Sequence, residues 1–120
     1  MITDIRTVGV PVTDQDRAID FFVGALGFEK TMDAPLDEAT RWVEVAPPGS
    51  TTSLALISGQ GAAGVDTGVR FVVPDAAVEH QRLVDAGAAT GDLLEWDGVP
   101  PMFTVDDPDG TRYYVVAIGD

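Results

Sequence analysis

Cysteine is absent from this 120-residue chain, and histidine occurs once, as His80. The missing thiols exclude disulfides, thiolate metal sites and cysteine nucleophiles, and they fit a reducing compartment. No segment approaches 18 consecutive apolar residues, and the first residues, MITDIRTV, lack the apolar core of a signal peptide. We therefore expect a soluble, cytoplasmic protein without a membrane partner.

Basic residues are scarce: seven Lys plus Arg stand against twenty Asp plus Glu, a formal net charge of −13. Such a surface repels phosphate backbones and lacks the basic patch that supplies nucleic-acid affinity, so nucleic acid is not an expected partner. A cationic or neutral ligand is easier to accommodate. The alternative is that the acidity only keeps a small protein soluble.

Apolar residues are plentiful, at 45% of the chain against 22% charged residues. This balance and length are typical of one globular domain that buries its core without covalent cross-links. The segment VGVPVTDQDRAIDFFVGALGFE (8–29) contains a strand pattern, an N-cap at Thr13 or Asp14, and apolar residues at helical spacing. Gly27 stands where a left-handed residue would end the helix. The segment therefore predicts a strand, a helix and a second strand.

The same order of elements occurs twice in the chain. Val12-Thr13-Asp14 matches Val73-Pro74-Asp75 at an offset of 61 residues, and Gly27 matches Gly87 at an offset of 60. We expect strands at 5–12, 29–33, Arg41–Ala46, Ser53–Ser58, 69–73, 93–95, 102–105 and 112–118, helices at 14–26 and 75–86, and a hinge at 59–64. The expected fold class is α+β, a single domain built from two βαβββ modules at about 1–58 and 65–120.

Alternation along the strands predicts which side chains face the helices and which face the other, concave side of each half-barrel sheet. The helix-facing set is Val8, Val10, Val12, Val43, Val45, Leu54, Leu56, Val69, Phe71, Val73, Phe103, Val105 and Val115. The residues between them should line a ligand cavity. His80 falls on the apolar stripe of the second helix, and we expect it on the convex side, away from that cavity.

The sequence VPVTDQDRAIDFFVGALGFE, the DPDG at 107–110 before the last strand, and the duplicated βαβββ order together resemble the vicinal oxygen chelate superfamily. This superfamily includes glyoxalase I, bleomycin-resistance proteins and extradiol dioxygenases, and the resemblance covers essentially the whole chain. It implies a homodimer with ligand pockets at the interface. The DPDG segment also has a purely structural interpretation as a turn.

In the enzymes of that superfamily, four strands supply the ligands of one metal ion, usually His, Gln or Glu. The resemblance places these positions at Thr7, Ser53, Gly68 and Tyr114, and none is an acid, an amide or a histidine. Two hydroxyls, a phenol and a glycine do not make a divalent-cation site. We therefore expect no metal and no cofactor.

The expected ligand site is apolar and aromatic with a few polar groups. It consists of Trp42, Glu44, Arg70, Trp96, Met102, Thr104, Tyr114, Val116, Thr7 and Ser53, with Trp96 on a Gly/Pro loop between two strands. Two alternatives remain open: Trp42 and Met102 could only fill the core, and Glu44 and Arg70 could only pair with each other.

This composition favours a protein that binds a small, aromatic antibiotic or natural product without catalysis. Such binding would confer resistance, as the resemblance to bleomycin-resistance proteins implies. The alternative is a metal-independent or divergent lyase, isomerase or dioxygenase-like enzyme of the same fold, with Glu44 as base and Arg70 or Tyr114 as electrophile. A domain without any ligand is a third possibility.

Overall fold

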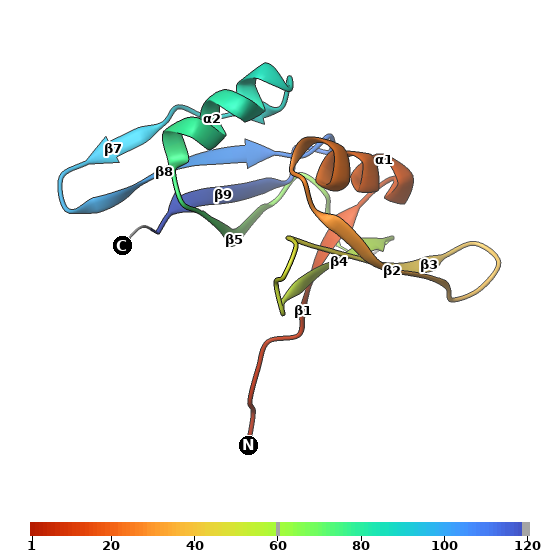
Figure 1. Ribbon diagram of the computed structural model, residues 1–120. Helices are drawn as coiled ribbons and strands as arrows, with labels where there is room; N and C mark the ends of the chain where they lie inside the picture. Colours follow the sequence, from red (N-terminus) through yellow and green to blue (C-terminus); the bar gives the residue numbers. More distant parts are fainter. Residues whose placement is uncertain (60, 119–120) are drawn as a thin grey trace. The chain divides into compact units, whose positions relative to one another are not determined.

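The computed structural model describes residues 1–59 and 61–118. Gln60, which belongs to the predicted hinge, lies outside the described residues. The chain divides into two compact units, a first half (Met1–Ala63) and a second half (Gly64–Asp120). The described residues form nine strands in two sheets together with helices, which confirms the predicted α+β class (Figure 1). Neither sheet closes into a barrel.

The first half follows the predicted βαβββ order, with a helix in two parts. Its elements are β1 (Thr7–Val12), α1 (Gln15–Ile19), a π-helical continuation η1 (Asp20–Ala25), β2 (Glu29–Pro35), β3 (Arg41–Ala46) and β4 (Ser53–Ser58). The sheet order is β1-β4-β3-β2. β1 pairs with β4 in parallel, and the other pairs are antiparallel. The first and last strands of this half are therefore neighbours.

The helix of the first half begins where the sequence indicates. Asp14 is the N-cap, and its Oδ1 accepts a hydrogen bond from the backbone N–H of Arg17 at 3.1 Å. Gly27, at φ +77°, follows the helix in the left-handed region, as predicted. Ala18 and Phe22, one helical turn apart, are buried. The helix thus covers one face of the sheet with its apolar stripe.

The second half repeats this order with one additional short strand. Its elements are β5 (Asp66–Val73), α2 (Ala76–Asp85), β6 (Ala89–Thr90), β7 (Leu94–Trp96), β8 (Val99–Asp106) and β9 (Arg112–Ala117). The sheet order is β5-β9-β8-β6, with β7 also paired to β8. β5 and β9 run in parallel, like β1 and β4. The two-residue β6 was not predicted from the sequence.

The segment 95–102 forms part of a β-hairpin and not the Gly/Pro loop that the sequence suggested. Trp96 pairs with Val99 around Asp97-Gly98, and Gly98 has φ +79°. Asp-Gly is a common hairpin turn because glycine adopts a positive φ without steric cost. Pro100 and Pro101 nevertheless lie within β8, which therefore begins three residues earlier than expected.

The predicted helix-facing set supplies most of the core. Val10, Val12, Val43, Val45, Leu54, Leu56, Phe103, Val105 and Val115 are buried, whereas Val8, Val69, Phe71 and Val73 are only half-buried. Tyr113, which was not singled out from the sequence, is fully buried and stacks on Phe71 with ring centroids 5.5 Å apart. Alternation with Val115 places Tyr113 on the helix side of its sheet.

Within the described residues, no helix has both the length and the apolar character needed to span a membrane.

Leu83 tests the packing of α2 on its sheet. Its side chain is completely buried, whereas the neighbouring Val84 is 44% exposed. Leu83→Ala should lower the free energy of unfolding by about 2–5 kcal/mol, because it removes buried methyl groups and leaves a cavity. Val84→Ala is the matched control and should have a much smaller effect. Urea titration measures both, and equal effects would contradict this packing.

Candidate functional site

In the first half, the predicted site residues lie on the sheet face opposite α1 and η1. Strand pairing places Thr7 beside Ser53 and Glu44 beside Ala55. These residues alternate with the core residues along β1, β3 and β4, so their side chains point away from the helix. The pairing thus brings together, on one face, positions that lie more than 40 residues apart in the chain.

Glu44 is the centre of this face. Its side chain is only 4% exposed, and its two carboxylate oxygens accept three side-chain hydrogen bonds. Oε1 accepts from Ser53 Oγ at 2.6 Å, and Oε2 accepts from Trp42 Nε1 at 2.7 Å and from Arg6 Nη1 at 3.2 Å. A buried carboxylate needs such donors, because an unpaired buried charge is costly.

These donors lower the pKa of the Glu44 carboxyl from its ordinary value. The largest cause is the hydrogen bond from Ser53, followed by that from Trp42; the charge and hydrogen bond of Arg6 act in the same direction, and burial opposes them. Glu44 is therefore an ionised, hydrogen-bonded carboxylate. It holds the indole of Trp42 in a defined orientation on the sheet.

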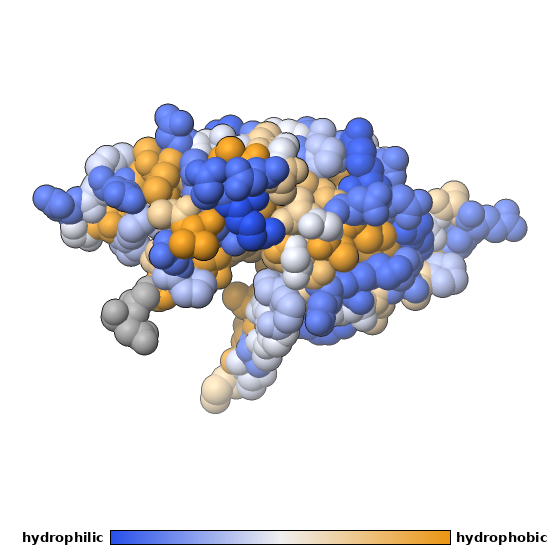
Figure 2. Space-filling model, turned by 45° about the horizontal axis from the view of Figure 1, so that its top comes forward, coloured by the Kyte–Doolittle hydropathy of each residue, from blue (hydrophilic) through white to orange (hydrophobic). Residues whose placement is uncertain are grey.

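In the second half, strand pairing places the predicted residues in two rows on the face opposite α2. The first row is Arg70, Tyr114 and Thr104, on β5, β9 and β8. The second row is apolar and is here called the apolar ledge; it consists of Val72, Val116, Met102 and Leu94. Val72 is 61% and Leu94 36% exposed. Figure 2 shows hydrophobic residues interspersed with hydrophilic ones on the visible surface.

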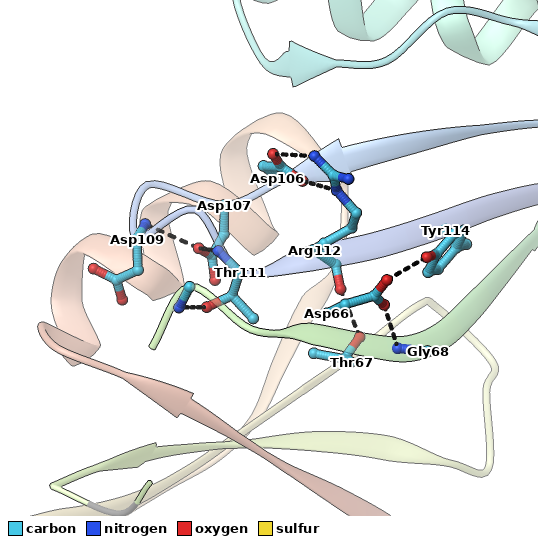
Figure 3. Close-up of polar contacts among 10 residues, drawn as sticks. Asp66, Thr67, Gly68, Asp106, Asp107, Asp109, Thr111, Arg112 and Tyr114 are labelled. Atoms are coloured by element: carbon cyan, nitrogen blue, oxygen red, sulfur yellow. Dashed lines mark hydrogen bonds and ion pairs between the residues drawn. The ribbon is translucent and has the colours of Figure 1, made fainter. Parts of the chain in front are cut away.

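Tyr114 is held by polar contacts on β5 (Figure 3). Its hydroxyl donates to Asp66 Oδ2 at 2.5 Å, while Asp66 Oδ1 accepts from the Gly68 N–H at 3.0 Å. The hydrogen bond with Tyr114 is the largest cause of a lowered pKa at Asp66, and the same bond raises the pKa of Tyr114. The guanidinium of Arg70 lies 4.5 Å from the centroid of the Tyr114 ring.

Trp96, the remaining predicted site residue, lies at the end of β7. Trp96 is 60% exposed and pairs with Val99, and a register shift separates it from the pairing of Leu94 with Met102. Leu94, not Trp96, is thus the cross-strand neighbour of Met102. Leu94, Arg6 and Asp66 were missed in the sequence; alternation around Met102 could have identified Leu94, but nothing in the sequence pairs Arg6 with Glu44 or Asp66 with Tyr114.

His80 lies on the helix side of its sheet, as predicted. Its ring packs edge-on against the buried Phe103 with centroids 5.0 Å apart, and its Nε2 lies 2.9 Å from the carbonyl oxygen of Gly91. The DPDG segment is the predicted turn: the Gly110 N–H donates to the Asp107 carbonyl, and Asp107 Oδ1 accepts from the N–H groups of Asp109 and Thr111 (Figure 3). His80 and the DPDG segment therefore both have structural roles.

The four positions that correspond to metal ligands do not fit a metal ion. Thr7 Oγ1 donates to the Ser53 carbonyl oxygen, Ser53 Oγ donates to Glu44, and Tyr114 donates to Asp66, while Gly68 has no side chain. The described residues also contain no group of three His, Asp or Glu side chains that could hold a cation. Neutral hydroxyls that donate to a neighbouring carboxylate or carbonyl are poor ligands for a divalent cation.

A separate cavity of about 480 Å³ lies in the second half. It is bounded by the start of α2 (Pro74–Ala77), by Glu95 and Pro100–Pro101, and by Ala117 and Ile118 at the end of β9. Among the described residues that line it, none belongs to the predicted ligand site.

Glu44→Gln should lower the free energy of unfolding at neutral pH by about 1–3 kcal/mol, because an amide cannot accept all the hydrogen bonds that the carboxylate accepts. The folded-state pKa of Glu44 lies below the ordinary value of 4.5. The contribution of ionised Glu44 to the free energy of unfolding is therefore complete above pH 4.5 and is lost as the pH falls through the folded-state pKa. Below that pKa, wild type and Glu44→Gln should have the same free energy of unfolding.

Urea titrations of both proteins between pH 3 and 7 measure this difference. Glu38→Gln, at an exposed position, is the matched control and should behave as wild type at every pH. A difference between wild type and Glu44→Gln that stays constant down to pH 3 would contradict the assignment of an ionised Glu44.

We also expect the purified protein to contain no stoichiometric Zn, Ni, Fe or Mn, because the donor set does not fit these ions. Elemental analysis measures the content directly. A chelator should leave the melting temperature unchanged; one bound metal per chain, removed together with stability, would show that the donor set had been misjudged.

The chain matches known proteins over almost its full length. A family model described as the Glyoxalase/Bleomycin resistance protein/Dioxygenase superfamily matches residues 4–114. A superfamily member from Sphaerobacter thermophilus DSM 20745 is 30% identical over 98% of both chains, with a TM-score of 0.90. TnmS3, an antibiotic binding protein from Streptomyces sp. CB03234, is 28% identical over 97% of this chain and 96% of its own, with a TM-score of 0.87.

Among curated proteins, the uncharacterized protein YetH of Bacillus subtilis (strain 168) is 41% identical over 56 residues. The match spans 47% of this chain and 47% of YetH, so it covers about half the length of that relative. The family model and the full-length structural match agree with the repeated sheets and with the resemblance seen in the sequence. The chain belongs to the glyoxalase/bleomycin resistance protein/dioxygenase superfamily.

Proposed function

We propose that this protein binds a small, planar aromatic antibiotic or natural product in the cytoplasm without altering it chemically, and thereby confers resistance. The observation that carries the proposal is the hydrogen bonding of the residues at the four positions where the resemblance places metal ligands. The hydroxyl groups of Thr7, Ser53 and Tyr114 donate hydrogen bonds to protein acceptors, and Gly68 has no side chain that could bind a metal ion. The fold is thus present with a donor set that suits binding better than metal catalysis.

The sheet faces opposite the helices support aromatic binding. In the first half the half-buried indole of Trp42 is oriented by Glu44, and in the second half Tyr114 lies beside the apolar ledge. Rings held in one orientation lose little conformational entropy when a ligand stacks on them. The similarity to TnmS3, which is described as an antibiotic binding protein, supports the same ligand class.

The alternative, a metal-independent enzyme that uses Glu44 as general base, receives less support. An effective base at neutral pH has a pKa near 7, whereas hydrogen bonds lower the pKa of Glu44 below its ordinary value. Its oxygens accept from Ser53, Trp42 and Arg6, which act as fixed partners in the protein. This environment stabilises the carboxylate and makes it a weak proton acceptor.

We also propose that the protein is a homodimer with two equivalent pockets at the interface between copies. The exposed apolar side chains of the second half, such as Val72 and Ile118, support association, because large exposed apolar patches often mark contact surfaces. Sedimentation at micromolar concentration should give twice the mass of one chain. A monomer under these conditions would exclude the interfacial pockets.

Binding can be tested with a panel of planar aromatic antibiotics. Trp42→Ala should weaken binding of a panel member at least about tenfold, because it removes apolar contact area and a ring pair worth about 0.5–1.5 kcal/mol beyond that area. Tyr114→Ala should act similarly. Titration calorimetry measures the affinities, and mass spectrometry should recover the ligand chemically unchanged.

His80→Ala is the matched control, since it truncates a ring on the opposite side of the sheet. Only variants with an intact melting transition are compared. A panel compound that is recovered chemically modified would support the enzyme alternative, and wild-type affinity in Trp42→Ala together with a loss in His80→Ala would invert the assignment of the two faces.

A further inference from the structure

We propose that Arg70 recognises an acidic group, a carboxylate or a phenolate, on the planar aromatic ligand, with the ring system lying on the apolar ledge. This inference rests on the proposed function and names the chemistry of its ligand. It concerns the second half alone, where Arg70 and the ledge share one sheet face.

Arg70 is held in position by two contacts. Its Nη1 donates to the carbonyl oxygen of Gly68 at 2.7 Å, and its guanidinium carbon lies 4.5 Å from the centroid of the Tyr114 ring. The first contact lies at a register shift between Asp66 and Arg70, where Gly68 adopts φ +68°. The side chain is exposed, so its remaining N–H groups face solvent or a ligand.

Other arginines of this chain use their guanidinium groups differently. Arg112, on the adjacent strand β9, forms a two-point ion pair with Asp106, with distances of 2.9 and 3.2 Å. Arg41 pairs with Asp16 and Asp33, and Arg82 pairs with Glu79. Within the described residues, no carboxylate oxygen lies within ion-pair distance of Arg70. A guanidinium without a carboxylate partner is suited to bind one from a ligand in a two-point geometry.

The carboxylate of Asp66, on the same strand, leaves Arg70 able to bind an acidic group. Asp66 accepts hydrogen bonds from the Tyr114 hydroxyl and the Gly68 N–H, and the charge of Arg70 helps to lower the pKa of Asp66 without a direct ion pair between them. The net charge of −13 still disfavours an approaching anion. Salt screens that distant repulsion over about 8–10 Å, whereas a direct contact with Arg70 is screened much less.

The spacing of the two rows fits an aryl acid. Arg70 and Val72 are two residues apart on β5, and so are Tyr114 and Val116 on β9, which corresponds to about 6.5 Å along each strand. An aromatic ring placed over Val72, Val116 and Met102 would therefore bring a carboxylate on its edge to the Arg70 row. Thr104, in the same row, offers a hydroxyl as an additional donor.

Three probes of equal ring size test the inference: 2-naphthoate, the neutral 2-naphthamide and the cationic 2-(aminomethyl)naphthalene. In titration calorimetry on the full-length protein at about 0.15 M salt, where the distant negative charges are screened, 2-naphthoate should bind about tenfold or more tightly than 2-naphthamide, and the cationic probe most weakly. Arg70→Gln should abolish the preference for 2-naphthoate. Arg70→Lys, which keeps the charge but loses the two-point geometry, should retain part of it.

Arg82→Gln is the matched control, because it removes the same charge from α2, whose residues lie on the other side of the sheet; it should keep the full preference. The proposed role of Arg70 is wrong if 2-naphthamide or the cationic probe binds most tightly, or if Arg70→Gln keeps the preference for 2-naphthoate. The proposed aromatic binding would stand in either case. If none of the three probes binds wild type up to its solubility limit, the proposed aromatic binding fails, and the inference fails with it.

Discussion

Parallel pairing between the first and last strands of each half is the constraint on which the site depends. β1 pairs with β4 and β5 pairs with β9, so residues that are 44 to 46 positions apart in the sequence become direct neighbours. Parallel strands require a crossover connection, and here the helix and the intervening strands provide it. Thr7 meets Ser53 and Arg70 meets Tyr114 through this arrangement. A shift of one residue in either register would move these side chains to the helix side.

The same construction has produced two chemically different faces. In the first half, an ionised carboxylate is buried and satisfied by three donors, and it orients an indole. In the second half, a cation is exposed, stacked on a phenol ring and placed beside an apolar row. The repeat matches Glu44 with Thr104 and Thr7 with Gly68, so the charge of one half has no counterpart at the corresponding position of the other. One fold can host many functions through such differences between sites.

Hydrogen bonds within the protein occupy the hydroxyl groups at two of the positions where the resemblance places metal ligands. Ser53 and Tyr114 each donate to a carboxylate that lies on the same face, Glu44 and Asp66 respectively. The hydroxyls therefore lower the pKa of their partners and fix side-chain orientation. These two hydroxyls thus stabilise the conformation of the sheet faces on which they lie.

Local patterns in the sequence determined the α+β class, the duplicated order of elements and core residues such as Val45 and Phe103, and they limited the first N-cap to Thr13 or Asp14, because these features depend on periodicity and capping between near neighbours. Alternation also determined which predicted residues share a face. The short β6 and the π-helical η1 were not predicted, and neither was the start of β8, where pairing with β7 overrode the local signals of Pro100 and Pro101. Only the tertiary structure decided that Arg6 meets Glu44 and that Asp66 meets Tyr114. Side chains far apart in sequence find their partners through strand register, and no tight turn fixes that register between strands joined by a long crossover, such as β1 with β4 and β5 with β9.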